Sequence, residues 1–367
     1  MKKLIYFMFI LILISCSESK ENMIPIDRSG LNEDVGTNNN PPDNSTTSGW
    51  LIPISEVKDG GPGKDGIPSI DMPMFLDAND PVTNYLNDDD LVVGVVNGGE
   101  AKAYPHLILD WHEVVNDIIG NAFATISYCP LTGTAFAWES MVNGVKSTFG
   151  VSGLLYNTNL ILYDRSTDSN WSQMGLKCVN GDRIGDEPKL LDVIETNWGT
   201  WKSLYPNSQV LSQDTGFNRP YGEYPYGDYK TNHEFFIFSA SPSNSALPNK
   251  ERVYAIINGK KSKVYQFEKF TGGIAIKETF NGNEYVVVGN NEIIYAFELN
   301  ESQSALNFQY EFDNSEVFFS DNEGNKWSVF GSAIEGPRTG EMLKGAKFVV
   351  SFWFAVAAFY PNPIIYQ

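Results

Sequence analysis

The stretch VVGVVNGGEAKAY, residues 92–104, decides the fold because the chain contains its pattern twice. Residues 253–265 read VYAIINGKKSKVY, so both stretches have an apolar run, an Asn-Gly turn and a second run that ends in tyrosine. Residues that favour β-strands on both sides of Asn-Gly are typical of a β-hairpin. A hairpin that recurs along the chain predicts a mainly β protein with an internal duplication.

Further matches keep the same order along the chain. GTAFAWE (133–139) aligns with EIIYAFE (292–298), NWS (170–172) with KWS (326–328), and WGTWKSLYPN (198–207) with WFAVAAFYPN (353–362). Each copy is expected to contain a hairpin, further strands, a Trp-Ser element and a closing helix that ends before a proline. The predicted fold class is mainly β with a few short helices, a β-rich α+β protein. We expect the duplication to give a two-lobed, barrel-like arrangement of β-sheets.

The N-terminus has the layout of a lipoprotein leader. Two lysines precede an apolar stretch that is too short for an ordinary transmembrane span, and this stretch closes on Leu-Ile-Ser-Cys16, which resembles the bacterial lipobox. We expect residues 1–16 to be the signal peptide and Cys16 to be lipidated. The protein would then be exported and anchored to a lipid bilayer of the cell envelope, with the outer membrane as the expected site. A plain secretory signal is the alternative.

Composition divides the rest of the chain. Residues 17–49 are rich in Ser, Asn, Asp, Pro and Gly, and such a segment buries too little apolar surface to fold, so we expect a disordered tether. The folded part is expected to consist of an N-terminal repeat, residues 50–220, and a degenerate C-terminal repeat, residues 221–367. The first repeat is predicted to carry the functional site.

Charge and motifs exclude two classes of partner. The net charge of −19 argues against nucleic acid and against electrostatic docking on anionic lipid. The glycine-rich stretch DGGPGKDGIPSID, residues 59–71, lacks the Gly-Lys-Ser/Thr ending of a phosphate-binding loop, so we expect no nucleotide. This stretch is interpreted as a rigid loop beside the site.

The duplication separates scaffold residues from residues special to one copy. Positions shared by both copies, such as Trp198 and Trp353, are best explained as scaffold. Six residues of the first copy have no obvious counterpart in the second: His106, His112, Glu113, Cys129, Asp164 and Arg165. Asp164 and Arg165 are interpreted as a structural ion pair, and the other four are the candidates for a site.

A transition-metal site is the leading hypothesis for these residues. His106 and His112 are six residues apart, which puts them on one face of an extended segment, and Cys129 ends the next predicted strand. A thiolate with imidazoles suits zinc or copper, and Glu113 or Met174 would complete the ligand set. The predicted role is metal binding with redox or hydrolytic chemistry. A buried, structural imidazole is the alternative for both histidines.

Cys129 has other possible roles. It could be a catalytic nucleophile activated by His112, with Glu113 as a further catalytic residue. It could pair with Cys178 in a disulfide, since an exported protein lies in an oxidising compartment, or fill the core as an inert thiol. A non-catalytic module that binds a glycan or a protein through exposed tryptophans and the loop YGEYPYGDY (221–229) is the alternative function. A structural envelope protein is a third possibility.

Several long motifs resemble one bacterial family. GGPGKDGIPSID, WHEVVND, YCPL, FGVSGLLYNTNLILYDRSTDSNWSQ and the closing FWFA…FYP are similar to the domain-of-unknown-function family DUF3179, over about residues 50–366. The resemblance implies no activity, and it implies an exported or lipid-anchored protein because members often are. Many members have a second cysteine where this chain has Thr132, so the resemblance implies no dithiol chemistry here. It leaves Cys129 and His112 as the site residues.

Overall fold

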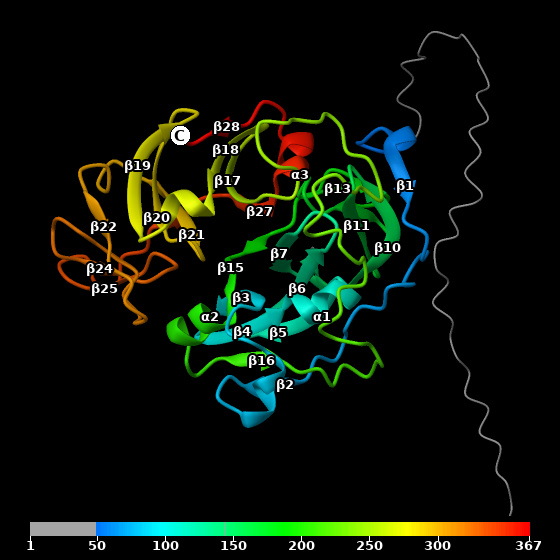
Figure 1. Ribbon diagram of the computed structural model, residues 1–367, viewed down its shortest axis with the longest axis horizontal. Helices are drawn as coiled ribbons and strands as arrows, with labels where there is room; N and C mark the ends of the chain where they lie inside the picture. The colour runs from blue at the N-terminus through cyan, green and yellow to red at the C-terminus, as the bar shows by residue number, and fades with distance from the viewer. Residues whose placement is uncertain (1–48, 143) are drawn as a thin grey trace, which may run out of the picture. The chain divides into compact units, whose positions relative to one another are not determined.

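The computed structural model describes residues 49–142 and 144–367, and within them the apolar runs of the sequence form the expected strands. The quoted hairpins begin with β3 (Leu91–Asn97) and β17 (Arg252–Asn258). The predicted signal peptide, the lipidation site Cys16 and all but the last residue of the predicted tether lie outside the described residues. The mainly β fold class is confirmed (Figure 1).

Each hairpin forms the centre of an open sheet. The first sheet is β15 (Val193–Asn197), β3, β4 (Glu100–Pro105), β16 (Gln209–Leu211) and β2 (Phe75–Asp77), in that order. The second is β27 (Phe348–Phe352), β17, β18 (Lys261–Gln266) and β28 (Ile364–Ile365). In both, the first hairpin strand has an antiparallel neighbour and the second hairpin strand has a parallel one. The same pairing pattern therefore occurs twice.

A second pair of sheets also repeats. The first copy has the order β14 (Leu190–Leu191), β7 (Thr134–Glu139), β6 (Ala122–Cys129) and β5 (Val114–Ile119). The second copy has β26 (Lys344–Gly345), β21 (Ile294–Leu299), β20 (Asn283–Gly289) and β19 (Ile274–Phe280). The turn Cys-Pro-Leu-Thr-Gly, residues 129–133, connects β6 to β7.

The third pair of sheets contains the Trp-Ser elements. The first copy has the order β1 (Val57–Asp59), β10 (Phe149–Tyr156), β11 (Asn159–Asp164), β12 (Asn170–Ser172) and β13 (Lys177–Asn180). The second copy has β22 (Phe308–Tyr310), β23 (Phe319–Asp321), β24 (Lys326–Trp327) and β25 (Ala333–Glu335). A separate two-stranded ribbon pairs β8 (Met141–Val142) with β9 (Val145–Lys146).

The Trp-Ser elements are held in the same way in both copies, which corrects one expectation. The indole of Trp171 donates to Asp164 at 3.0 Å, and that of Trp327 donates to Asp321 at 2.8 Å. Asp164 therefore has a structural counterpart in the second copy, contrary to expectation. Arg165 pairs with Asp71 at 2.9 Å, so the predicted Asp164–Arg165 ion pair is also wrong.

Short helices connect the sheets. The α-helices of the described residues are α1 (His106–His112), α2 (Trp198–Leu204) and α3 (Trp353–Phe359), and the 3-10 helices are η1 (Ile54–Glu56), η2 (Pro81–Tyr85) and η3 (Phe267–Phe270). The helices α2 and α3 end just before the Tyr-Pro-Asn sequences, as expected. Since α1 follows β4 and η3 follows β18, the first copy has an α-helix where the second has only a short 3-10 helix. No helix among the described residues is long and apolar enough to cross a membrane.

Two details of the predicted architecture are wrong. Every sheet in residues 49–142 and 144–367 keeps free edge strands, so none closes into a barrel. His106 and His112 lie in the helix α1 and not in an extended segment. Because each helical residue turns by about 100°, residues six apart point in different directions, and the two histidines do not share a face.

The two copies share one core. The main chain of Phe352 in β27 donates to Thr132 at 2.8 Å, and the hydroxyl of Ser351 lies 2.8 Å from that of Thr134 in β7. One apolar cluster contains both Cys129 and Trp353, and the described chain forms one compact unit. Between β16 and β17 the chain has neither helix nor strand over residues 212–251, which we call the cover segment. The predicted boundary between repeats, after residue 220, falls within it.

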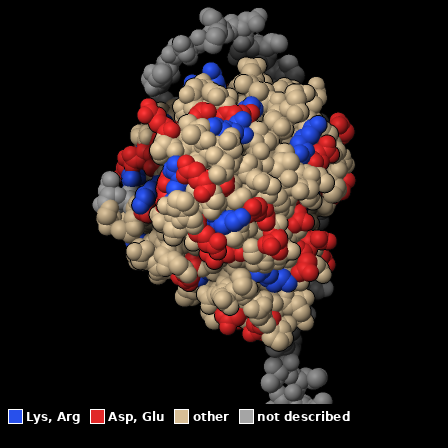
Figure 2. All heavy atoms as spheres, turned by 90° about the vertical axis from the view of Figure 1, so that its left-hand side faces the viewer, with Lys and Arg blue, Asp and Glu red and all other residues tan. Residues whose placement is uncertain are grey.

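Charged side chains of both signs share the surface. Figure 2 shows lysines and arginines beside aspartates and glutamates over one face of the molecule. Arg338–Glu323 at 2.7 Å and Lys344–Glu298 at 2.9 Å are two such pairs. The acidic excess of the sequence is thus interspersed with basic groups on this face.

Candidate functional site

Helix α1 and the residue that caps it carry four of the buried polar side chains of the site. The helix starts after Pro105 and ends at His112, and its cap Glu113 has a left-handed backbone with φ of 58°. The helix lies against β6, and its residues His106, Asp110 and His112 are all buried together with Glu113. A helix that buries this many titratable groups is not explained by hydrophobic packing alone, because burial of ionisable groups is costly.

His112 is held by hydrogen bonds at both ring nitrogens. Its Nδ1 lies 2.8 Å from the carbonyl oxygen of Pro68, which can only accept, so this nitrogen carries the proton. Its Nε2 lies 2.6 Å from the hydroxyl of Tyr221 and accepts from it. Burial lowers the pKa of His112 to about 4, so the ring is neutral at pH 7. His112 therefore fixes Tyr221 and has no free nitrogen to offer Cys129.

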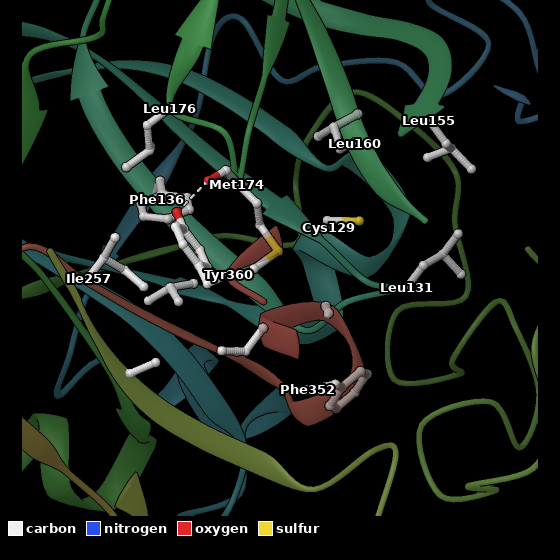
Figure 3. Packing of buried hydrophobic residues seen from close by; sticks show 14 of the residues in the cluster. Cys129, Leu131, Phe136, Leu155, Leu160, Met174, Leu176, Ile257, Phe352 and Tyr360 are labelled. Carbon is white, nitrogen blue, oxygen red and sulfur yellow. Dashed lines mark hydrogen bonds between the residues drawn. The ribbon is translucent and has the colours of Figure 1, made fainter. Parts of the chain in front are cut away.

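Cys129 lies at the end of β6 in an apolar environment. Figure 3 shows its side chain in one cluster with Leu131, Leu155 and Leu160. Burial, and next the negative charge of Glu113, raise the pKa of its thiol to about 11. Both Cys129 and Cys178 are free thiols, so the structure has no disulfide between them.

A buried polar network fixes the turn that carries Cys129. The amide of Asn159 donates to the Thr132 hydroxyl at 2.9 Å and to Gln173 at 2.7 Å. The Gln173 amide in turn donates to Ser127 at 3.1 Å and to the carbonyl of Thr134 at 3.1 Å. All five residues are almost fully buried. A fully satisfied network of this kind makes the local geometry rigid and unique.

Glu113 is the ionisable group next to the thiol. Burial, and next the charge of Asp110, raise its pKa to about 8. The main-chain amide of Tyr128, the residue before Cys129, donates to the Glu113 carbonyl at 2.7 Å. The main chain of Glu113 is thus bonded to the strand that carries Cys129, and the Glu113 charge acts on the thiol.

Backbone strain surrounds the thiol on two sides. Thr158 has a φ of 68°, which is rare for a β-branched residue, and its carbonyl oxygen lies 3.8 Å from the sulfur of Cys129. Glu113, whose charge acts on the thiol, has a φ of 58°. Such conformations cost on the order of 1–3 kcal/mol each and cluster at functional sites.

A second group of charges lies farther along α1. The Asp110 carboxylate accepts from Lys230 at 2.8 Å, and Glu195 of β15 accepts from Arg252 of β17 at 2.9 Å. The His106 ring packs on Tyr128 with centroids 4.3 Å apart, and its Nε2 lies 3.6 Å from Glu195. Burial raises the pKa of Asp110 to about 6 and lowers that of His106 well below its usual value. Helix α1, both copies and the cover segment all contribute to this group.

The cover segment closes the site. The hydroxyls of Tyr224 and Tyr229 donate to the carbonyls of Pro130 and Leu131 at 3.1 and 3.0 Å. The Thr158 hydroxyl donates to the carbonyl of Phe238 at 3.0 Å. In Figure 1 this segment runs as a light-green coil across α1 and β13. Irregular connections longer than about 12–15 residues are uncommon and are often lids or binding loops.

The predicted site residues separate into different environments. The Glu113 charge acts on the Cys129 thiol, Met174 packs in the cluster of Cys129, and His112 and His106 each have other partners. Among residues 49–142 and 144–367, no three His, Cys, Asp or Glu side chains are placed to hold a metal ion. The copper or zinc site, with Cys129, His112 and His106 as ligands, stays a prediction.

The residues needed for the predicted glycan-binding surface are not exposed. Every tryptophan except the partly buried Trp50 is buried, so the expectation of exposed tryptophans is wrong. Three tyrosine hydroxyls of residues 221–229 form hydrogen bonds inside the protein, with His112 of α1 and with the turn after Cys129. Surface clefts of about 260 and 320 Å³ lie elsewhere, and neither is lined by Cys129 or Glu113.

Sequence reasoning missed four residues of the site: Asp110, Glu195, Lys230 and Arg252. The signal for Asp110 was its spacing of four from His106, which places both on one face of a helix. Because the segment after Pro105 was expected to be extended, the spacing of four did not indicate that His106 and Asp110 share a face. Glu195, Lys230 and Arg252 are far apart in the chain and only the tertiary fold unites them.

Comparison with known proteins gives one match. A family model described as a protein of unknown function, DUF3179, matches residues 64–363. This range includes the whole cover segment and the strands of the sheets except β1 and β28. No curated protein and no solved structure gives a significant match to the chain.

Proposed function

The chain belongs to the DUF3179 family, and from this premise we propose that Cys129 is the nucleophile of a thiol-dependent acyl-transfer or hydrolysis reaction. The observation that carries the proposal is the buried carboxyl group of Glu113, which is close enough to Cys129 for its charge to raise the pKa of the thiol. Burial of a carboxyl group costs stability. Its position next to a thiol gives it a chemical use, as the acceptor of the thiol proton.

The two groups titrate as a pair. At pH 7 both hold their protons, because the pKa of Glu113 is about 8 and that of Cys129 about 11. Loss of the first proton, near pH 8, leaves a Glu113 carboxylate that can accept the thiol proton. The thiol itself ionises only near pH 11, because burial and next the charge of Glu113 raise its pKa. The pair is therefore active in its singly charged form.

The reaction that this pair supports is nucleophilic substitution at an acyl carbon. As the sulfur of Cys129 bonds to the acyl carbon, the thiol proton moves to Glu113. The bond between the acyl carbon and its leaving group breaks, and Glu113 returns the proton to the leaving group. Water or another nucleophile then attacks the thioester, and Cys129 leaves as the thiol. Atoms and charges balance without a metal, oxidant or reductant in these steps.

The cover segment gives access to the site. Cys129 is 1% exposed, so substrate reaches it only when residues 212–251 move away from the turn 129–133. Its irregular backbone and its hydrogen bonds through tyrosine hydroxyls suit a segment that opens and closes. In the closed state it excludes water, which protects a thioester from early hydrolysis.

The metal hypothesis is the alternative use of the same thiol. It needs the lone pair of His112 Nε2, which the hydroxyl of Tyr221 occupies. It would therefore require the cover segment to release His112 before copper or zinc could bind. Elemental analysis of the purified protein and of Cys129→Ser separates the two readings: near-stoichiometric metal that the substitution abolishes would support the metal site.

The direct test of the proposed reaction is capture of an acyl group on Cys129. The full chain is incubated with p-nitrophenyl acetate at pH 8, and the acetylated peptides are identified by mass spectrometry. We expect acetyl on Cys129 and release of nitrophenol, both lost in Cys129→Ser and reduced about 10²-fold or more in Glu113→Gln. Cys178→Ser is the matched control, because Cys178 is equally buried and free, and it should react like the wild type.

The proposal fails if Cys129 stays unmodified while the protein is folded. It also fails if Glu113→Gln reacts as fast as the wild type, because the carboxyl would then have no role. Thermal melting of each variant shows that the fold is intact.

A further inference from the structure

Resting on the proposed function, we infer that the substrate carries a positively charged amine, and that this amine binds where the ammonium group of Lys230 lies in the closed structure. Lys230 would thus be a stand-in for the substrate, supplied by the cover segment. The substrate class is an acyl compound with an ammonium group, for example an aminoacyl or amino-terminal peptide group.

The surroundings of Lys230 are those that recognise an ammonium ion. Its Nζ lies 2.8 Å from the Asp110 carboxylate and 4.1 Å from the centroid of the Tyr224 ring. A carboxylate combined with an aromatic face is a common binding site for cations, through a charge-assisted hydrogen bond and the ring quadrupole. The Lys230 side chain is 31% exposed, so solvent already reaches this position.

The site holds more hydrogen-bonding capacity than its own residues satisfy. Three buried atoms have no hydrogen-bond partner within the described residues: Oδ1 of Asp110, Oε2 of Glu195 and Nε2 of His106. Their side chains belong to residues that are 5%, 4% and 5% exposed. Unsatisfied buried polar atoms are rare in native proteins and require an explanation. A ligand with several N–H donors would satisfy both carboxylate oxygens.

The carboxylates of Asp110 and Glu195 lie in a helix and a strand of the core, whereas Lys230, the cation that pairs with Asp110, lies in the cover segment. Glu195 lies in the sheet strand β15 and uses one carboxylate oxygen for Arg252 of β17. Asp110 lies in the buried helix α1. Lys230 is in the cover segment, so opening the cover leaves Asp110 without its cation. An incoming ammonium group restores the charge balance.

The cation site adjoins the thiol. Asp110 is close enough to Glu113 that its charge helps to raise the pKa of Glu113. Tyr224, which faces Lys230 with its ring, donates through its hydroxyl to Pro130, the residue next to Cys129. Tyr224 therefore touches both the cation site and the turn that carries Cys129. We expect an acyl carbon a few bonds from the bound amine to reach the sulfur.

Three thiol reagents of similar size and different charge test this inference. The full chain is treated with 2-aminoethyl (cationic), 2-hydroxyethyl (neutral) and 2-sulfonatoethyl (anionic) methanethiosulfonate, and modification of each cysteine is followed by mass spectrometry. The ratio of cationic to neutral rate at Cys129 is expected to exceed that at Cys178 about tenfold or more. Comparison within one molecule removes the general attraction of an acidic protein for cations.

Variants identify the groups responsible. Asp110→Asn and the near-isosteric Glu195→Gln should each lower the cationic preference at Cys129 severalfold, and Lys230→Met should raise it because the stand-in is gone. Asp89→Asn is the control, since it removes one carboxylate of an exposed residue remote from these contacts, and it should change nothing. Melting temperatures confirm that the variants are folded.

The outcomes separate the two proposals. Equal charge preference at Cys129 and Cys178, with Cys129 reactive, overturns the amine inference and leaves the thiol reaction standing. A preference at Cys129 that survives both Asp110→Asn and Glu195→Gln also overturns the inference. If no reagent modifies Cys129 in the wild type or in Lys230→Met, the proposed function fails as well.

Discussion

Glu113 is the residue whose burial lowers the stability of the protein and whose carboxyl group is the proposed proton acceptor. Its pKa in the folded protein, about 8, lies above its ordinary value of 4.5 because of burial and the charge of Asp110. The folded protein therefore binds more protons than the unfolded chain between these two pH values. By linkage, the free energy of unfolding falls as pH rises through this window, and the full penalty is present above pH 8.

At the residue scale, Glu113→Gln should stabilise the protein at alkaline pH. Glutamine carries no charge, so the penalty disappears, and at about 1.4 kcal/mol per pKa unit the gain at pH 8.5 is on the order of a few kcal/mol. The gain should shrink as the pH falls toward 5. Urea denaturation at several pH values measures it, with the exposed Glu301→Gln as the control. A gain independent of pH would contradict the buried, perturbed carboxyl.

At the scale of elements, helix α1 and the cover segment act together. The helix presents His112 to Tyr221, and the strained turn after β10 presents Asn157 and Thr158 to the cover segment. Asn157 accepts from the main chain of Ser241 at 3.0 Å. The segment is thus held by single hydrogen bonds at several points, which allows it to open without unfolding the sheets.

Tyr221→Phe should loosen this closure. The change removes the donor to His112 Nε2 and leaves that nitrogen buried and unsatisfied, which costs about 1–3 kcal/mol. We expect alkylation of Cys129 by iodoacetamide to accelerate at least severalfold while Cys178 reacts as before. Tyr310→Phe is the matched control, because Tyr310 accepts from Asn290 at 3.0 Å in the second copy. Equal acceleration in both variants would mean that global unfolding exposes the thiol.

The strands were predictable from sequence, whereas α1 was not. Runs such as 91–97 and 253–258 consist mainly of β-favouring residues and lead into Asn-Gly turns, so the local sequence predicts that they are strands. The segment His106–His112 has only two turns, and apolar periodicity over so few residues does not separate helix from strand. Cys129 and Glu113 were found because they are absent from the second copy. Tyr221, which bonds to His112, and Lys230, which bonds to Asp110, come from the cover segment far along the chain, and no local pattern predicts these contacts.

At the scale of the whole molecule, the two copies depend on each other. The carboxylate of Glu195 in the first copy is buried, and Arg252 in the second copy donates to it through Nε and to the Glu195 main-chain carbonyl through Nη2, each at 2.9 Å. The core around Cys129 also includes Trp353 of the second copy. Side chains of the second copy therefore complete the surroundings of the site in the first copy.

Arg252→Met should destabilise the protein by about 3–5 kcal/mol, because the Glu195 charge loses its buried partner. The control is Lys344→Met, which breaks an ion pair whose lysine side chain is 72% exposed and should cost at most about 1 kcal/mol. Urea denaturation compares the two variants. Equal costs would contradict a shared, buried junction between the copies.

The pH dependence of Cys129 alkylation tests most directly whether Glu113 activates the Cys129 thiol. The rate constant for iodoacetamide is measured from pH 6 to 11 by mass spectrometry in the wild type and in Glu113→Gln, with Cys178 as the reference in the same molecule. We expect the wild-type rate constant to rise with a midpoint near the Glu113 pKa of about 8 and then to level off. In Glu113→Gln this step should vanish, and the rate should rise only toward the thiol pKa, as for Cys178, whose own pKa is about 11. Identical profiles for Cys129 in the two proteins would contradict a thiol that Glu113 activates.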